Sequence, residues 1–249
     1  MNEIIETILN HRSIRKYEDK PLTEEQIEII VKSAQAASTS SYVQAYTIIG
    51  VKDKEKKKEL ARLAGDQTYV ENNGHLLIFC ADLHRHELIG EMENTEVSQS
   101  LDTTESFMIA VIDAALAAQN AALAAESMGL GICYIGGLRN NLVEVSEVLR
   151  IPKHVIPLFA MTIGYPLHTS DKKPRLPFKH IYHEEEYQPD SSILKEQLED
   201  YNETVQQYYE ERTNGKRQDT WTSQMAERFS EPRRIYMKEY VQKQGFDKK

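Results

Sequence analysis

The stretch TESFMIAVIDAALAAQNAALAAESM, residues 104–128, decides the fold of this chain of 249 residues. Alanines and large aliphatic residues such as Ile112 and Leu116 occupy most of its positions over about seven helical turns. A helix that is apolar on nearly every side has to be enclosed by other parts of the protein, and alanine lets its neighbours approach closely. The stretch therefore predicts a central, enclosed helix that ends at Gly129.

Short apolar segments on both sides of this helix have the composition of strands. They are residues 46–51, 76–80, 131–137 (a strand and then a turn) and 158–164. Helices are expected over residues 4–9, after a capping box of Thr23 and Gln26, from Asp53 to Gly65, and from a cap at Asn140 to Leu149. Strands and helices thus alternate, which predicts a layered α/β or α+β domain.

The composition excludes several classes of protein. Thirty Lys+Arg against thirty-nine Asp+Glu give a net charge of −9, which argues against a nucleic-acid-binding protein. No basic start followed by an apolar run is present at the N-terminus, and no eighteen apolar residues follow one another without a charge. Two cysteines are too few for a disulfide scaffold. We expect a soluble, cytoplasmic protein that binds neither nucleic acid nor membrane.

The segment after residue 181 differs from the rest of the chain. Charged residues and tyrosines dominate residues 182–249, and apolar residues keep a helical period from Ile193 to Tyr208. These apolar residues are too few to build a core of their own. We therefore expect residues 1–181 to form the main domain and 182–249 to form a helical arm on it or on a second subunit.

Glycine-rich phosphate loops and the common hydrolase motifs are missing from the sequence. A phosphate-bearing cofactor would therefore need side-chain donors. His11, Arg12, Ser13 and Arg15 supply such donors within five residues. A second basic cluster, residues 172–177, is held by two prolines. An ordinary surface loop is the alternative for each cluster, and it is the commoner meaning of such a segment.

Other polar groups are weaker candidates for a site. Arg212, Lys216 and Arg217 surround a Thr-Asn-Gly turn, which indicates either an anionic ligand or simple helix capping. Two histidine pairs, at 84 and 86 and at 180 and 183, have no partner cluster at zinc-like spacing, so no metal site is expected. Cys80 and Cys133 lie in apolar segments typical of buried, inert thiols. Since no nucleophile–base pair is evident, a cofactor would carry the chemistry.

Several of these segments occur in the same order in one family. They are residues 11–15 (HRSIR), 36–44 (AASTSSYVQ), 124–131 (AAESMGLG), 134–140 (YIGGLRN), 173–177 (KPRLP) and 212–221. Together they resemble the NADPH-dependent, oxygen-insensitive nitroreductase and flavin reductase family, which binds FMN. The resemblance extends over practically the whole chain. It implies an α+β fold with a central, mostly antiparallel sheet flanked by helices, in an intertwined homodimer.

The resemblance assigns roles to residues of this sequence. FMN would be held by His11, Arg12, Ser13, Arg15, Gln67, Tyr134, Ile135, Gly136, Gly137, Lys173 and Arg175, and by Thr39 and Ser40 of the other subunit. The residues that would contact NADPH or the substrate are Ser41, Tyr42, Arg139, Arg212, Arg217 and Arg234. Residues 1–181 would form the FMN-binding core, and 182–249 would wrap the partner subunit and carry the NADPH loop.

The implied activity is ping-pong hydride transfer from NADPH to N5 of FMN, followed by reduction of nitroaromatics, quinones, free flavins or oxygen. No side chain acts as a catalytic nucleophile in such a reaction. Thr39 stands where serine is usual and keeps the hydroxyl. The turn at 213–216 varies in the family, which leaves NADH open as a second donor. A flavin carrier or sensor without turnover is the alternative, and it would leave Arg212 and Arg217 without a role.

Overall fold

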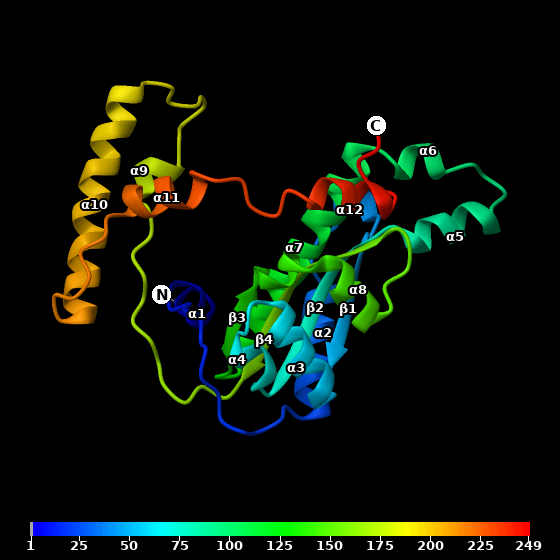
Figure 1. Cartoon of the computed structure of the whole chain (residues 1–249), viewed down its shortest axis with the longest axis horizontal. Coiled ribbons are helices and arrows are strands. Elements are labelled where there is room, and N and C mark those ends of the chain that lie inside the picture. The colour runs from blue at the N-terminus through cyan, green and yellow to red at the C-terminus, as the bar shows by residue number, and fades with distance from the viewer. Residues whose placement is uncertain (1) are drawn as a thin grey trace. The chain divides into compact units, whose positions relative to one another are not determined.

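The computed structural model describes residues 2–249, and the chain divides into two compact units (Figure 1). The first unit comprises the chain up to Ser170 together with Arg234–Lys249, and the second is Asp171–Arg233. These bounds differ from the division expected after residue 181. The end of the chain returns to the first unit because Tyr240, Val241 and Phe246 are buried in its core.

A four-stranded sheet forms the centre of the first unit. Its strands are β1 (Tyr46–Val51), β2 (His75–Asp82), β3 (Gly131–Ile135) and β4 (Val155–Gly164), in the spatial order β1-β2-β4-β3. Each neighbouring pair is antiparallel, with Ile48 opposite Phe79 and Tyr134 opposite Met161. All four expected strands are confirmed, and so is an α+β architecture with an antiparallel sheet.

Helix α7 (Thr104–Ser127) lies with α2 (Glu24–Gln35) on one face of the sheet. Its alanines at 117, 118, 121, 122 and 125 are buried against Phe79 and Met161. The opposite side of α7 is open in the single chain, because Met108, Ile112 and Leu116 are 51%, 46% and 44% exposed. The helix predicted to be enclosed is therefore covered on one side only by its own chain.

By length and composition alone, α7 could also cross a membrane, since it has 24 residues of high mean hydropathy. The core helix of a globular protein meets the same two criteria. Here α7 packs on the sheet and carries the buried carboxylate Asp113 in its middle. Its apolar character is thus explained by packing in the first unit.

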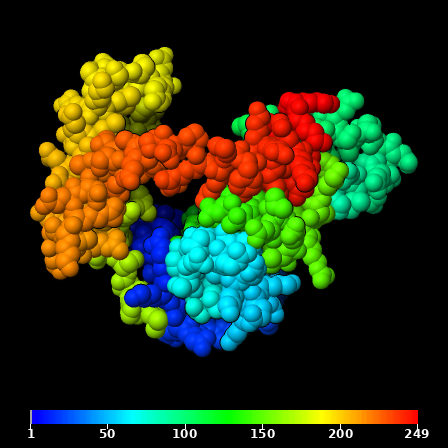
Figure 2. Space-filling model, in the orientation of Figure 1, coloured from blue at the N-terminus to red at the C-terminus, as the bar shows by residue number. Residues whose placement is uncertain are grey.

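The other face of the sheet is covered by α3 (Lys54–Leu63), α4 (Thr68–Glu71) and α8 (Leu142–Leu149). In the space-filling view, the cyan atoms of α3 and α4 hide the strands behind them (Figure 2). Asp53 caps α3 as expected. The expected cap at Asn140 is wrong, because Asn140 ends the 3-10 turn η2 (Gly136–Asn140) and α8 begins only at Leu142.

Shorter helices complete the first unit. They are α1 (Glu3–Leu9), the 3-10 turn η1 (Ser40–Tyr42), α5 (His84–Met92), α6 (Ser98–Leu101) and α12 (Met237–Lys243). The second unit contains α9 (Phe178–Ile181), α10 (Ser191–Thr213) and α11 (Trp221–Phe229). Its small core is formed by Tyr201, Val205 and Tyr209, with partly buried neighbours around them. The helical period expected from Ile193 is confirmed by α10.

His75 at the start of β2 makes the first unit sensitive to acid. The imidazole is 3% exposed, and its Nε2 has no hydrogen-bond partner within residues 2–249. Burial, and then the nearby Lys57 and Lys52, lower its pKa from 6.5 to about 4. Between pH ~6.5 and about 4 the His75 side chain of the unfolded chain binds a proton, whereas that of the folded chain does not. The free energy of unfolding therefore decreases as the pH falls through this range.

We expect His75 to remove about 2 kcal/mol of stability between pH 7.5 and pH 5. His75→Gln keeps a polar side chain of similar size that does not titrate, so the variant should lose that much less over the same interval. Urea unfolding of both proteins at the two pH values measures the difference. Equal losses in the wild type and the variant would contradict the role given to His75.

Candidate functional site

The basic segment after α1 is fixed along the edge strand β3. Ser13 forms a parallel bridge with Ile132, and the backbone N–H of Ile14 donates to the carbonyl of Ile132 at 2.8 Å. Ile14 is buried against Gly131, where a Cβ would lie 2.6 Å from its Cγ1. These contacts hold the backbone of the segment, so the positions of its polar side chains are set by the sheet.

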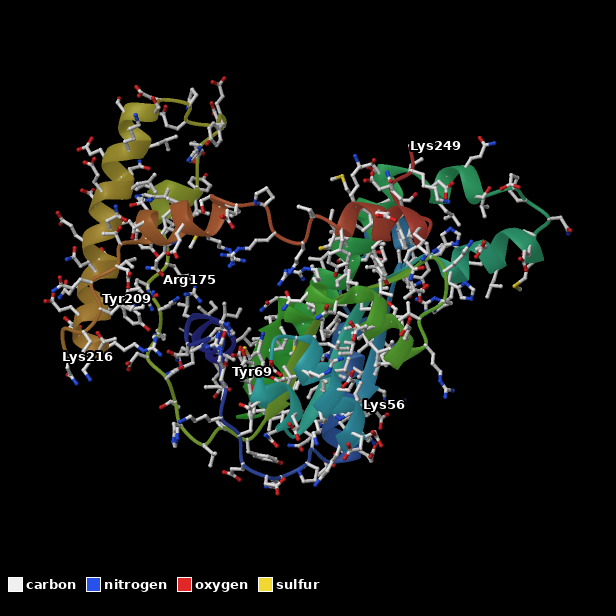
Figure 3. All side chains as sticks on the ribbon, in the orientation of Figure 1. Lys56, Tyr69, Arg175, Tyr209, Lys216 and Lys249 are labelled. Atoms are coloured by element: carbon white, nitrogen blue, oxygen red, sulfur yellow. The ribbon has the colours of Figure 1, made fainter. Side chains whose placement is uncertain are left out.

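Tyr69 of α4, labelled in Figure 3, contacts both Arg15 and Gln67. The Arg15 guanidinium lies 5.9 Å from the centroid of the Tyr69 ring. The Tyr69 hydroxyl donates to Oε1 of Gln67 at 2.6 Å, and Nε2 of Gln67 donates to the carbonyl of Ala64 at 2.7 Å. The structure therefore brings together two predicted FMN residues, and Tyr69 is a connecting residue that the sequence did not indicate.

The turn after β3 packs directly on Gln67. A Cβ on Gly137 would lie 2.4 Å from the carbonyl oxygen of Ala64 and 2.6 Å from Nε2 of Gln67. Ile135 is buried below the turn, while the ring of Tyr134 lies edge-on to Phe159 with centroids 5.6 Å apart. Gly137 thus lies against Gln67, and Tyr134, Ile135 and Gly136 directly precede it along β3, the edge strand to which Ser13 is bridged.

Arg139 and Arg234 meet at the end of this turn. Arg139 donates to the carbonyl of Leu158 at 2.5 Å, and Nε of Arg234 donates to Oδ1 of Asn140 at 2.9 Å. Burial, and then Arg234, lower the pKa of Arg139 from its usual value. The Tyr236 hydroxyl donates to the carbonyl of Arg139 at 2.8 Å and accepts from the N–H of Leu142 at 2.9 Å. Tyr236 is a second connecting residue that the sequence did not indicate.

The segment from Thr39 to Ala45 has an unusual backbone. Ser41, Tyr42 and Gln44 have φ values of 45°, 62° and 55°, in the left-handed region that costs free energy for residues other than glycine. The buried carboxylate of Asp113 accepts from the N–H of Ser40 at 2.9 Å and from that of Ala45 at 3.0 Å. Asp113 therefore holds both ends of the segment to α7. The sequence signal that could have indicated Asp113 is that it is a lone acidic residue in the middle of an apolar helix.

One chain does not bring all the predicted cofactor residues of the first unit together. Glu126, near the end of α7, contacts His11 at 2.7 Å, whereas Asp113 lies thirteen positions earlier and contacts Ser40. At 1.5 Å per residue the two carboxylates are about 20 Å apart along the helix. Thr39, Ser40, Ser41 and Tyr42 are therefore far from the segment of His11, Arg12, Ser13 and Arg15 of the same chain.

The predicted cations of the second unit gather around two tyrosines. The Arg217 guanidinium stacks 3.9 Å from the centroid of the Tyr209 ring, and Nζ of Lys173 lies 5.7 Å from the same centroid. Arg212 donates to the Tyr208 hydroxyl at 2.8 Å. The structure thus brings Lys173 and Arg217 together, although the resemblance assigns them to different ligands.

A cavity of about 400 Å³ opens beside these cations. It is lined by Lys173, Arg175, Tyr201, Tyr208, Tyr209 and Trp221, with several aliphatic residues. Figure 3 labels Arg175 and Tyr209 on this unit. An ion pair with Asp219 raises the pKa of Arg217, so its charge is permanent. Permanent cations on aromatic rings suit an anionic ligand with a planar group.

The histidine pairs and cysteines take part in local structure. Within residues 2–249 no group of three or more histidine, cysteine or carboxylate side chains could hold a metal ion. His86 lies 2.9 Å from the carbonyl of Val43, and His183 accepts from the N–H of Gln188. Cys80 and Cys133 are free and buried, and burial raises the pKa of both thiols. The expected burial of both thiols is confirmed.

Comparison with known proteins agrees with this geometry. A model of the nitroreductase family matches residues 8–165, and a model of the C-terminal domain of that family matches residues 173–249. The chain belongs to the nitroreductase family. The family resemblance inferred from the ordered motifs is confirmed, and the chain is an oxidoreductase of this family.

Individual relatives match over their whole length. The chain is 56% identical over 248 residues to a Bacillus subtilis protein named FMN reductase (NADPH), with 100% of both chains covered. The solved structure of Bacillus megaterium NfrA1 is 69% identical, with a TM-score of 0.98 over 99% of this chain and 100% of that one. The NADPH:FMN oxidoreductase of Vibrio harveyi, solved with NAD⁺, is 40% identical, with a TM-score of 0.90 over 100% of both chains.

Proposed function

We propose that this protein is an NADPH-dependent FMN oxidoreductase that binds FMN where β3 and its following turn meet the basic N-terminal segment. The observation that carries the proposal is the convergence of Ser13, Arg15, Gln67 and the Gly136–Gly137 turn at one edge of the sheet. Relatives that match over their whole length are named FMN reductase (NADPH) and NADPH:FMN oxidoreductase, which supports the same cofactor and donor here.

The donor set fits FMN. The guanidiniums of Arg12 and Arg15 and the hydroxyl of Ser13 suit a phosphate and a polyhydroxyl chain. The amide of Gln67, held by Tyr69, presents a donor and an acceptor to the polar rim of a flavin ring. The family resemblance also assigns Lys173 and Arg175 to FMN, and this assignment stays a prediction.

The active form is proposed to be a homodimer in which each FMN is bound by both chains. Met108, Ile112 and Leu116 leave an apolar stripe on α7 that a second copy would cover. A homodimer would also explain why residues 39–42 and 11–15 of one chain lie about 20 Å apart along α7, since each group would then belong to a different FMN site. Residues 39–42 would then act on the flavin of the partner, and Arg139 and Arg234 would border the substrate space.

FMN, when bound, supplies a two-electron acceptor and donor, so the side chains need only bind, orient and exclude solvent. We propose that NADPH binds first and leaves before the electron acceptor enters, which is a ping-pong order. Nitroaromatics, quinones, free flavins and oxygen are the proposed acceptors, because an open stacking face discriminates poorly between planar molecules. The cytoplasm is the proposed location, and NADH is a possible second donor.

An absorbance spectrum of the purified protein, followed by anaerobic addition of NADPH, tests this function. We expect flavin absorbance bands that bleach within the mixing time. Bands that persist after NADPH is added would instead support a flavin carrier or sensor. A colourless protein that takes up no added FMN would refute both readings.

The cations of the second unit should determine the affinity for NADPH. We expect the double variant Arg212→Ala/Arg217→Ala to raise the KM for NADPH at least tenfold, because two charge-assisted contacts to the 2′-phosphate are lost. The KM for NADH, which lacks that phosphate, should change little. Arg228→Ala, on the exposed face of α11, removes one charge from the same unit and serves as the control. Equal changes for NADPH and NADH would contradict the assignment.

A further inference from the structure

Glu126 has no role in the function proposed so far. It lies near the C-terminal end of α7, and its side chain is only 13% exposed. Its Oε1 is 2.7 Å from Nδ1 of His11, which directly precedes the proposed phosphate ligands. A contact this short between a carboxylate and an imidazole determines where the imidazole carries its hydrogen.

A carboxylate can only accept hydrogen bonds, so Nδ1 of His11 must carry the hydrogen that lies between the two groups. In a neutral imidazole the other ring nitrogen, Nε2, is then a bare lone pair. A bare lone pair would repel the oxygens of a phosphate. His11 can keep its contact with Glu126 and also donate to the phosphate of FMN only as an imidazolium, which carries hydrogens on both nitrogens.

Several negatively charged groups lie around the segment that begins at His11. From α1, Glu3 and Glu6 line a cavity of about 500 Å³ together with Glu126 and Arg12. The carbonyl end of α7 adds a partial negative charge beside the ring. Tyr134 of β3 also lies near Glu126, and its pKa is raised, first by burial and then by that carboxylate. Arg12 and, further along the segment, Arg15 are the opposing cations.

We propose that Glu126 is a positioning residue that makes FMN binding take up a proton at His11. The proton comes from the buffer and is bound at Nε2, so that His11 bridges the carboxylate and the phosphate dianion. No electrons move in this step. The inference rests on the proposed FMN site. The His11 imidazolium would lie between Glu126 and the dianionic phosphate and so reduce the repulsion between them.

Titration calorimetry of the FMN-free protein with FMN tests the proposal. An imidazole in water is mostly neutral at pH 8, and the FMN phosphate is already a dianion there. At pH 8 the heat of binding is measured in several buffers that differ in ionisation enthalpy. The slope of the binding heat against the ionisation enthalpy of the buffer gives the number of protons taken up. We expect an uptake of more than about half a proton per FMN for the wild type.

Three comparisons identify the groups involved. His11→Gln should abolish the uptake, and Glu126→Gln, which preserves shape and a hydrogen-bond acceptor, should reduce it at least twofold. Glu105→Gln, an exposed carboxylate on the same helix, should leave the uptake unchanged. Riboflavin, which has no phosphate, should bind the wild type without the uptake.

The outcomes are distinct. FMN binding without proton uptake by the wild type would overturn the inference and leave the proposed function intact. Unchanged uptake in Glu126→Gln would overturn the role of Glu126. Failure of the wild type to bind FMN at all would refute the proposed function instead.

Discussion

Replacing Asp113 by alanine should lower the free energy of unfolding by about 3 kcal/mol and weaken FMN binding more than tenfold. The carboxylate is fully buried and accepts from the N–H groups of Ser40 and Ala45. Without it these two N–H groups lose their acceptor, and the left-handed backbone at Ser41 and Tyr42 is no longer held. Thr39 and Ser40 would then lose the position from which they are proposed to reach the flavin of the partner subunit.

Urea unfolding and fluorescence titration with FMN measure the two effects of this variant. Asp113→Asn keeps one acceptor and should show roughly half the loss of stability. Glu105→Ala on the exposed side of α7 should change neither quantity. If Asp113→Ala lost stability but bound FMN as tightly as the wild type, the segment from Thr39 to Ala45 would not contribute to the cofactor site.

Gly137→Ala should weaken FMN binding at least a hundredfold. The new methyl group would lie 2.4 Å from the backbone carbonyl of Ala64, which cannot move without shifting the end of α3, and 2.6 Å from Nε2 of Gln67. Either the turn must therefore move away from Ala64 and Gln67, or the Gln67 amide must give way and lose its hydrogen bond to Ala64. Both the backbone of the turn and the amide of Gln67 are proposed to lie against the flavin ring.

Gly129→Ala is the matched control for this variant. Gly129 has a φ of +74°, but a Cβ there would have no heavy atom within 4 Å. The substitution should cost about 1 kcal/mol of stability through backbone strain and leave the affinity for FMN unchanged. Equal losses of affinity in the two variants would show that general destabilisation, and not the contact with Gln67, weakens the cofactor site.

Local features of the sequence predicted the secondary structure and the chemical character of the site. Strand composition located β1 and β2, and the capping box of Thr23 and Gln26 located the start of α2. The density of cations in residues 11–15 indicated an anion site, because charge and donor number are properties of the residues themselves. The cap at Asn140 failed because the turn from β3 continues through that residue before α8 begins.

The connecting residues Tyr69, Asp113 and Tyr236 could not be identified in the same way. Asp113 contacts Ser40 across 73 positions of the chain, and Tyr236 contacts Arg139 across 97. A lone acid in an apolar helix marks Asp113, but no local pattern in the sequence indicates that its partner is Ser40 or that Tyr236 contacts Arg139. Each depends on which segments the sheet and helices place side by side.

The sequence by itself therefore determined the family and the antiparallel α+β class, and it supplied the cluster of cations from which a phosphate site is proposed. Periodicity, capping and charge are local properties, and the ordered motifs combine them over the whole chain. Only the tertiary structure decided that Arg15, Tyr69 and Gln67 form one chain of contacts. It also placed Ser40 about 20 Å from His11 along α7. The path and register of the backbone determine such distances, because they set which side chains meet after folding.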